Sequence, residues 1–411
     1  MSTLEENPKG TADYCTACTS CIIACPVTAA TRKFKGPKLV GPAQSRMHFA
    51  EVDDEASLEF CSNCKNCDIS CPSGVAISTL NMLQRGEYYK THRHSLRDYI
   101  LAHSESMIKM ARRVPLGAFL ANLGAEIGRK SGMFKMVGIA SERPMPSYAK
   151  KSFLHQFREI EQVAYPDKVV FFPGCFVNEN NPEVGLALVR VMQQNHYEVI
   201  VDEEFVCCGS PLVVTGYLEE AKKKASKNTA ILRKWADKNY PILTCCTSCS
   251  LMLKQEYAEL FDLPDVDRNA ALIYDACEFL LDLYDKNRLN QNFNKLTEHY
   301  IYHAPCHLRV QGIGTPALEL LSLIPHSNVE NADAGCCGIS GNYGFKADKY
   351  EISMDVGREL FHRIKASVAD RVISDCGTCR VQIEHATGVQ AVHPIEVLCL
   401  AYGLGNLLDK K

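Results

Sequence analysis

Residues 14–26 read YCTACTSCIIACP and residues 60–72 read FCSNCKNCDISCP, so the chain twice places four cysteines within eleven positions. Both runs have the form C-x2-C-x2-C-x3-C-P. The first three cysteines of such a run lie close enough to surround one 4Fe–4S cube, whereas the fourth begins the next segment and reaches a second cube. The two runs therefore predict a pair of adjacent 4Fe–4S cubane clusters.

Crossed ligation then divides the eight thiolates between the two cubes. The expected ligands are Cys15, Cys18, Cys21 and Cys71 for one cluster and Cys61, Cys64, Cys67 and Cys25 for the other. The proline after each run fixes φ and lacks an N–H, which suits the end of a tight loop. Zinc also uses paired C-x2-C motifs, but a tetrahedral zinc site gains nothing from a third cysteine or from crossed pairing.

The remaining cysteines reveal a duplication. Two sets, each made of a single cysteine, an adjacent pair and a C-x2-C, recur about 130 residues apart. The first set is Cys175, Cys207, Cys208, Cys246 and Cys249, and the second is Cys306, Cys336, Cys337, Cys376 and Cys379. A glycine follows each adjacent pair and permits the turn that the pair needs. Three cysteines are left over, and we expect Cys245, Cys277 and Cys399 to be structural, although Cys245 could substitute for its neighbour.

Each copy has the same order of apolar runs and helical stretches. β-rich runs at 168–172 and 300–304 precede the single cysteines, and runs at 241–244 and 370–374 precede the C-x2-C pairs. Helical patterns at 182–194, 221–234 and 352–366 lie between them. Strands that alternate with helices favour small α/β units with parallel sheets, whose ligands gather at the carboxyl ends of the strands.

Five thiolates in one copy exceed the four that an ordinary cube needs. A fifth must bridge irons or distort the iron core. The alternatives are one ordinary cube, or no metal, in one of the copies.

Length, charge and cysteine usage limit the class of protein. The chain has 411 residues, 21 cysteines and a formal net charge of −3, which does not favour general nucleic-acid binding. The polar start MSTLEENPKG shows no secretory signal, so clustered thiols in a reducing cytosol favour metal over disulfides. Since we find no apolar run near eighteen residues, we expect a protein that is soluble or peripherally attached to a membrane.

The stretch between the two cysteine-rich regions is amphipathic. From Ser95, one helical face carries Leu96, Ile100, Met107, Ala111 and Val114, and a new helix after Pro115 carries Leu116, Phe119, Leu120, Leu123 and Ile127. Residues 105–140 carry a local charge of +4, from Lys109, Arg112, Arg113, Arg129, Lys130 and Lys135 against Glu105 and Glu126. Such helices can lie on an anionic membrane or pack against the repeats or a partner.

Three histidines lie near the cysteine motifs. His303, His307 and His393 could ligate or tune a cluster. We expect structural roles for them. No Ser–His–Asp arrangement or paired-carboxylate motif stands out, which suits a chain whose cofactors supply the chemistry.

Taken together, these motifs resemble a known family. Two ferredoxin-type motifs followed by two cysteine-rich CCG domains are similar to the iron–sulfur subunits of respiratory flavoprotein dehydrogenases and to heterodisulfide reductase. The resemblance is strongest to the family formed by the C subunits of anaerobic glycerol-3-phosphate dehydrogenases. The stretches that carry it are CTACTSCIIACPV, CSNCKNCDISCPSGV, GCFVNENNPEVG, HAPCHLR, CCGISGNYGFK, SDCGTCRVQIE and HPIEVL, which span nearly the whole chain.

The resemblance implies an electron-transfer subunit without catalytic residues of its own. Separate flavoprotein subunits would oxidise glycerol 3-phosphate, and this chain would pass the electrons towards the quinone pool from the cytoplasmic face of the inner membrane. It also implies that the two five-cysteine sets hold one or two non-cubane 4Fe–4S clusters, the first set being the less secure. The alternatives are an iron–sulfur subunit of a glycolate or lactate oxidase, a disulfide-reducing subunit like heterodisulfide reductase, and a non-redox metal or scaffold protein.

The expected fold is a multidomain α+β chain. A helical ferredoxin domain with two 4Fe–4S clusters should occupy residues 1–90, and a helical connector residues 91–165. Two tandem α/β CCG modules should follow at 166–285 and 297–405, related by pseudo-twofold symmetry.

Overall fold

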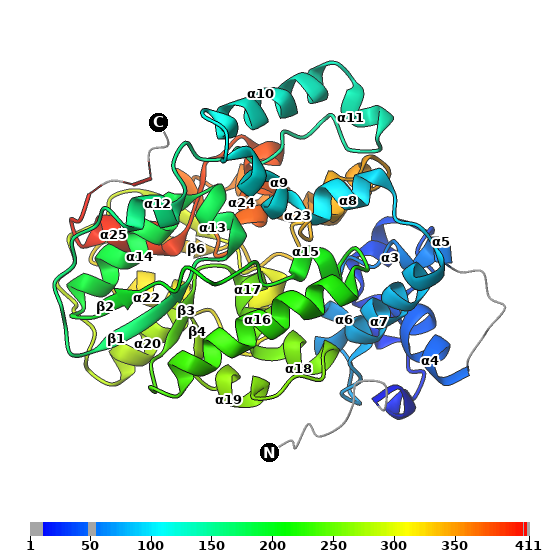
Figure 1. Ribbon diagram of the computed structural model, residues 1–411, viewed down its shortest axis with the longest axis horizontal. Coiled ribbons are helices and arrows are strands. Elements are labelled where there is room, and N and C mark those ends of the chain that lie inside the picture. The colour runs from blue at the N-terminus through cyan, green and yellow to red at the C-terminus, as the bar shows by residue number, and fades with distance from the viewer. Residues whose placement is uncertain (1–10, 48–54, 406, 409–411) are drawn as a thin grey trace.

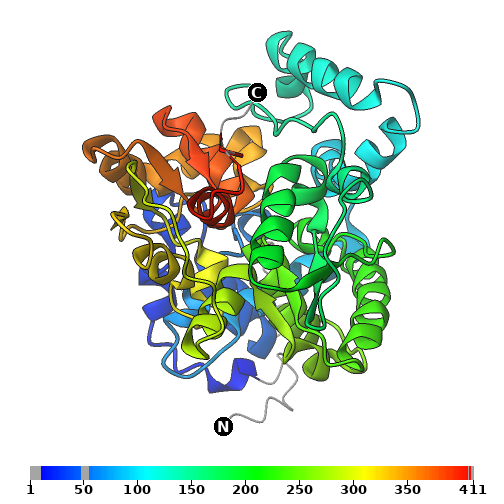
Figure 2. The same cartoon turned by 90° about the vertical axis from the view of Figure 1, so that its left-hand side faces the viewer.

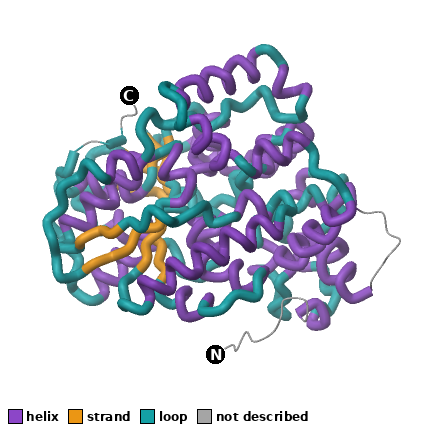
Figure 3. Tube along the Cα trace, viewed as in Figure 1, coloured by secondary structure: helices purple, strands orange, loops and turns teal. Residues whose placement is uncertain are grey.

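The computed structural model describes residues 11–47, 55–405 and 407–408, and the chain forms three parts (Figure 1). A helical N-terminal part lies at one end, two α/β repeats form the other end, and a helical connector arches over both. The strands are confined to the repeats, where helices surround them (Figure 3). The expected multidomain α+β class is confirmed.

The first repeat is built on a parallel four-stranded sheet. Its strand order is β2-β1-β3-β4. The strands are β1 (Lys168–Phe172), β2 (Glu198–Ile200), β3 (Ile242–Thr244) and β4 (Ile273–Asp275). Its main helices are α14 (Pro182–Gln194), α16 (Leu218–Ala236), α17 (Thr247–Leu251) and α20 (Ala276–Asp285). Helices cover both sheet faces, which is why β1 reads as the continuous apolar run KVVFF.

The second repeat has the same topology. Its parallel sheet has the order β6-β5-β7-β8, so each strand matches its counterpart in the first repeat. The strands are β5 (His299–Tyr302), β6 (Asn328–Asn331), β7 (Arg371–Ile373) and β8 (Ala391–Val392). The main helices are α22 (Pro316–Ser322), α23 (Tyr350–Ala366), α24 (Gly377–Thr387) and α25 (Pro394–Ala401). The duplication predicted from the cysteine spacing is therefore a duplication of the fold.

The two repeats lie side by side (Figure 2). Along their shared boundary, here called the seam, helices of one repeat pack on helices of the other. Helix α14 of the first repeat packs on α25 of the second, and α20 of the first packs on α22 of the second. Because α14 corresponds to α22 and α20 to α25, this reciprocal packing is the pattern that a pseudo-twofold axis produces. One continuous apolar core contains buried side chains of both repeats, such as Leu188 and Leu398.

The N-terminal part consists of short helices around its cysteine loops and one long helix. The short helices are α2 (Ser20–Ile23), α3 (Pro26–Ala30), α4 (Gln44–Met47), α5 (Glu55–Leu58) and α6 (Asn66–Ile69), and the long one is α7 (Ile77–Thr91). Helix α3 packs on α23, and α7 packs on α18 (Tyr257–Leu260), so this part contacts both repeats. The buried Lys65 forms an ion pair with Glu259 at 2.8 Å and thereby anchors a cysteine loop to the first repeat.

The structure divides the first amphipathic stretch of the connector differently from the prediction. Ser95 caps α8 (Leu96–Ala102), but the helix ends at His103 and α9 (Ser104–Ala111) begins there. The predicted single face is therefore wrong. The buried face instead contains Leu101, Ile108 and Asp98, whose carboxylate forms an ion pair with Lys346 of the second repeat at 2.7 Å. This polar contact decides which side of α8 packs.

Helix α10 (Gly117–Lys130) and the short α11 (Met133–Met136) form the outer edge of the connector, and α12 (Phe153–Phe157) leads into β1. All five apolar residues predicted to share a face of α10 are exposed, from 45% for Leu123 to 72% for Leu116. Twelve of the seventeen exposed large apolar side chains among the described residues lie between Leu96 and Met136. Within the described parts of the chain, no helix is both long and apolar enough to cross a membrane.

Candidate iron–sulfur sites

The two N-terminal cysteine runs fold into the same loop. Left-handed residues occur two and four positions after the first cysteine of each run, at Ala17 and Thr19 and again at Asn63 and Lys65. Alternation of right- and left-handed residues turns backbone N–H groups towards one concave side, which favours negative charge there. The third cysteine of each run then lies in a short helix, and the fourth follows that helix.

The folded loops bring together thiols from both runs. Burial raises the pKa of Cys21, and negative charge at Cys15, Cys71 and Cys18 raises it further, which places these four thiols in one group. In the other group, Cys25 of the first run lies near Cys61. The structure therefore brings Cys71 to the thiols of the first run and Cys25 to a thiol of the second run.

The first repeat gathers its five cysteines at the carboxyl ends of its strands. The Sγ atoms of Cys175 and Cys207 are 3.6 Å apart. Cys208 interacts with Cys207 on one side and with Cys249 on the other, and Cys249 also interacts with Cys246. The five thiols therefore form one continuous group.

Gly174 shows how closely the backbone approaches this first group. Its φ is +62°, and a Cβ built there would lie 2.8 Å from the Sγ of Cys249. A side chain at this position would clash with that thiol. Glycine therefore maintains the cradle that surrounds the group.

The second repeat forms a matching group that is more deeply buried. All five of its cysteines are buried, and the Sγ atoms of Cys337 and Cys379 are 3.2 Å apart. Cys306 interacts with Cys336, and Arg309 donates a hydrogen bond to the Sγ of Cys306 over 3.6 Å. In both repeats a left-handed glycine follows the adjacent cysteines, as expected.

The N-terminal part and the second repeat meet at their cysteines. Cys64 packs in one apolar cluster with Cys306 and Cys336. His307 strengthens this junction because its Nε2 lies 2.9 Å from the carbonyl oxygen of Asn63, and its Nδ1 lies 2.9 Å from the hydroxyl of Ser248. One histidine thus connects the N-terminal loops, the second repeat and the first repeat.

The other two histidines differ from each other. His303 lies within 4.8 Å of the thiols of Cys337 and Cys379, and its buried Nε2 has no partner among the described residues. His303 thus belongs to the second site, although the sequence favours a structural role for it. His393 instead caps α25, with its Nδ1 accepting a hydrogen bond from the N–H of Ile395.

The three leftover cysteines belong to the apolar core. Cys245, Cys277 and Cys399 are buried in the core that the two repeats share. Cys245 therefore faces the seam, whereas its neighbour Cys246 faces the site. This arrangement does not support a role for Cys245 as a substitute for Cys246 in the site.

The donor sets fit iron–sulfur clusters chemically. Burial raises the pKa of Cys64 well above its ordinary value, and hydrogen bonding with Cys337 and Cys376, together with burial, does the same for the pKa of Cys379. A thiolate in such surroundings needs nearby positive charge, which bound iron supplies. Groups of four and five converging sulfurs around glycine and left-handed loops match thiolate ligation of such clusters.

Comparisons with known proteins point the same way. The chain matches the 4Fe-4S dicluster domain family over residues 11–75. It matches the cysteine-rich CCG domain family twice, over residues 169–254 and 300–384. These ranges contain all eighteen cysteines of the four groups.

Similarity to one relative extends over nearly the full length of the chain. The chain is 34% identical over 394 residues to the C subunit of anaerobic glycerol-3-phosphate dehydrogenase of Escherichia coli K12, covering 95% of this chain and 98% of the relative. It is 32% identical over 57% of its length to the B subunit of fumarate reductase (CoM/CoB) of Methanothermobacter marburgensis, of which 46% is covered. It is 29% identical over 56% of its length to lactate utilization protein A 2 of Bacillus cereus Q1, of which 97% is covered.

Proposed function

The chain belongs to the iron–sulfur protein family formed by the C subunits of anaerobic glycerol-3-phosphate dehydrogenases, and from this membership we propose that it is the electron-transfer subunit of such a dehydrogenase. Flavoprotein subunits would oxidise glycerol 3-phosphate, and this chain would pass the electrons towards quinone. The clusters, when bound, would accept and release single electrons. The chain itself would hold, space and shield them.

We propose four sets of ligands, one for each group of thiols. Two cubane clusters would be held by Cys15, Cys18, Cys21 and Cys71 and by Cys61, Cys64, Cys67 and Cys25. Two further 4Fe–4S clusters of the non-cubane type would be held by Cys175, Cys207, Cys208, Cys246 and Cys249 and by Cys306, Cys336, Cys337, Cys376 and Cys379.

The observation that carries the proposal is the contiguity of the four groups. The first two share an apolar cluster in which Cys21 and Cys67 are both buried. Cys64 then contacts the second repeat through Cys306, and His307 bonds that repeat to Ser248, one residue before Cys249 of the first repeat. Shared apolar clusters thus connect the N-terminal thiols with the second repeat, and the hydrogen bond of His307 continues the connection to the first repeat.

The exposed end of this series suits contact with a flavoprotein. Cys18 is exposed, and the surrounding loops present Tyr14, Ile23 and Ile69 to solvent, with Ile23 83% exposed. Exposed apolar residues beside a redox site are typical of a protein docking surface. We therefore place electron entry at this end of the chain.

The connector supports peripheral attachment to the cytoplasmic face of the inner membrane. Its exposed apolar side chains lie in the same stretch of chain as six cations, four of which form ion pairs with carboxylates. Amphipathic helices with basic residues bind anionic bilayers without crossing them. Flotation of the holoprotein with anionic vesicles, compared with neutral vesicles, tests this attachment.

The function as a whole is tested with the anaerobically reconstituted holoprotein. Iron and acid-labile sulfide are measured first, because a colourless protein without sulfide contradicts every cluster assignment. The holoprotein is then mixed with its co-purified flavoprotein subunits and glycerol 3-phosphate, and bleaching of the visible absorbance is expected. Bleaching with lactate or glycolate instead would favour the alternative dehydrogenases, for which the lactate utilization relative is the supporting observation. Direct reduction of a disulfide would favour the heterodisulfide-reductase type.

A further inference from the structure

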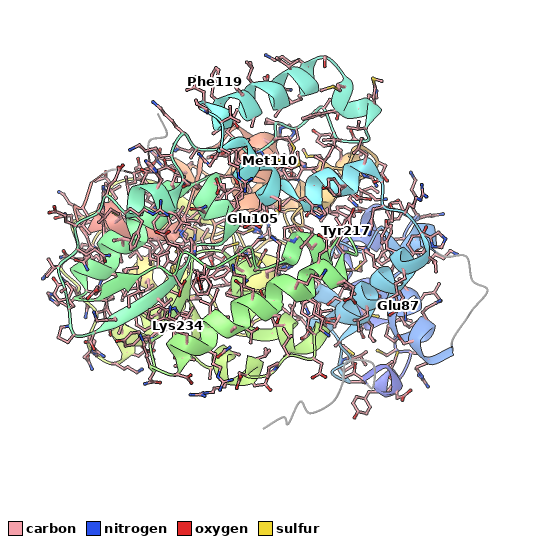
Figure 4. All side chains as sticks on the ribbon, in the orientation of Figure 1. Glu87, Glu105, Met110, Phe119, Tyr217 and Lys234 are labelled. Carbon is pink, nitrogen blue, oxygen red and sulfur yellow. The ribbon has the colours of Figure 1, made fainter. Side chains whose placement is uncertain are left out.

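A large apolar cavity lies between the connector and the repeats. Its volume is about 1190 Å³, above the 300 to 1,000 Å³ common for small-molecule sites. Its outer wall comes from α9, α10 and α11, and its inner wall from residues of both repeats. Three lining residues labelled in Figure 4 follow one another from the repeats out to α10: Glu105, Met110 and Phe119.

The inner end of the cavity reaches the proposed cluster ligands. Four of the five cysteines of the first group line it, as does Cys376 of the second group. Tyr148 also lines it and carries a phenol hydroxyl, which can donate a hydrogen bond. Hydroxyls of Ser210 and Thr378 are further polar groups in the lining.

The outer end of the cavity is apolar and open. Met110, Phe119 and Met133 line it and are 65%, 61% and 51% exposed. A ligand that enters here crosses an apolar rim rather than a polar one. This arrangement suits a molecule dissolved in lipid and disfavours a water-soluble substrate.

Specific polar contacts hold the connector over the cavity. Within the connector, Asn122 of α10 makes two hydrogen bonds of 2.8 Å with the backbone of Tyr148. Arg112, which follows the last residue of α9, forms an ion pair of 2.7 Å with Glu179 of the first repeat. Glu105 accepts a hydrogen bond of 3.2 Å from the backbone N–H of Cys207. The cavity is therefore a built feature of the fold with walls fixed at both ends.

We propose that this cavity is the binding site for a lipid-soluble quinone, whose ring would lie beside Tyr148 and the first-repeat cysteines and whose tail would leave past Phe119 and Met133. The inference rests on the proposed function, since it names where the electron acceptor binds. Reduction of one quinone to its quinol takes two electrons, which come from the oxidised substrate of the flavoprotein subunits, and two protons, which come from water. The phenol of Tyr148 binds a quinone carbonyl oxygen and gives up no proton overall.

Photolabelling maps the site independently of turnover. Oxidised holoprotein is illuminated with an aryl-azide derivative of a short-chain naphthoquinone, and labelled peptides are identified by mass spectrometry. We expect labels within residues 104–148 and their loss when unmodified naphthoquinone competes. Labels that fall only outside the cavity lining would overturn the assignment, whether or not any variant folds.

Two variants of α10 provide a matched comparison. Ala121 lines the cavity, whereas its neighbour Leu120 is 53% exposed and does not. Ala121→Trp should decrease both labelling and the rate at which naphthoquinone reoxidises dithionite-reduced holoprotein by about tenfold or more. Leu120→Trp should change neither, and both variants should keep the wild-type iron content.

The outcomes distinguish a wrong assignment of the cavity from a wrong proposal that the chain delivers electrons to quinone. If naphthoquinone reoxidises wild type and Ala121→Trp equally fast, the cavity assignment is wrong and electron delivery to quinone stands. If ferricyanide reoxidises the wild type but naphthoquinone does not, delivery to quinone is wrong together with the site.

Discussion

The two repeats share one topology and one cysteine pattern, yet their sites have different surroundings. In the first repeat, Cys175 and Cys246 are partly exposed and line the large cavity. In the second, all five cysteines are buried, and Cys306 contacts Cys64 of the N-terminal part. The first site is therefore the more exposed of the two, and it contributes four cysteines to the cavity lining, whereas the second contributes only Cys376. From this difference we propose that the second site is internal in the electron path and that the first is terminal.

The largest expected effect distinguishes two electron paths. In a series, electrons reach the first site only through the second; in a parallel arrangement, each site is reduced independently. Cys337→Ser removes a proposed ligand of the second site, and Cys208→Ser removes the matching ligand of the first, so each should lose about four irons per chain. In a series, Cys337→Ser prevents the flavoprotein from reducing the first site, whereas Cys208→Ser leaves the second site reducible. Freeze-quench Mössbauer spectra of the partner-reduced variants check this, with dithionite reduction as the control. Normal reduction of the first site in Cys337→Ser would mean that the repeats receive electrons independently.

A smaller effect should follow from the glycine that only the first repeat has before its single cysteine. Gly174 is left-handed, whereas the second repeat has Pro305 at the matching position with a φ of −64°. Gly174→Ala should destabilise the fold by about 1–3 kcal/mol and deplete iron from the first site, because the new Cβ meets Cys249.

Gly335→Ala is the matched control, because a Cβ at that position next to Cys336 meets no heavy atom within 4 Å. Chemical unfolding and iron analysis compare the two variants. An equal loss of iron in both would show that the tight cradle is not specific to the first repeat.

The two sites also differ in the charge near their single cysteines, because Arg309 is present only in the second repeat. Its guanidinium donates to Cys306 in the second site, whereas the matching residue of the first repeat is the neutral Asn178. A positive charge stabilises the reduced state, so Arg309→Gln should lower the midpoint potential of the second site by roughly 30–60 mV. A potentiometric titration followed by EPR measures the shift, and Arg309→Lys should restore part of it. A shift confined to the first site would contradict the contact.

The smallest effect concerns the seam that both repeats share. Burial and the neighbouring Asp375 carboxylate raise the pKa of Asp275 to about 8, so the folded chain holds a proton that the unfolded chain releases near pH 4. The stabilising contribution is complete below about pH 4 and is lost as the pH rises through about 8. The Tm of the wild type should therefore fall between pH 6 and pH 9.

Asp275→Asn should flatten this pH dependence. Asparagine can still cap α20 and never ionises, so local structure is kept. Thermal unfolding of both proteins across the same pH range provides the comparison. A slope that is unchanged in Asp275→Asn would assign the pH dependence to other groups.

Local patterns predicted much of the fold. The run KVVFF is β1 residue for residue, and the pattern at 182–194 is α14, because continuous apolar runs and 3.6-residue periodicity report burial directly. The spacing of the cysteines also predicted the duplication, whereas the crossed ligation of the two cubes stays a prediction.

What the sequence did not predict depends on contacts between distant segments. Nothing local connects Cys64 with Cys306, because their contact arises only when the N-terminal part packs on the repeats. His303 lies close to Cys306 in the sequence, but its place beside Cys337 and Cys379 depends on the folding of the repeat. The periodicity of the connector indicated apolar faces, but periodicity reports only that a face is apolar and not whether anything covers it. The cavity beneath α10 therefore had no signal in the sequence.

The reciprocal packing of α14 on α25 and of α20 on α22 has a consequence for the integrity of the chain. Each repeat supplies a helix that completes the apolar core of the other, so neither half has a closed interior by itself. Proteolytic cleavage in the connection between Asp285 and His299 should therefore leave two fragments that co-elute and separate only in denaturant. Co-expressed halves should associate into the folded protein, whereas either half expressed alone should aggregate.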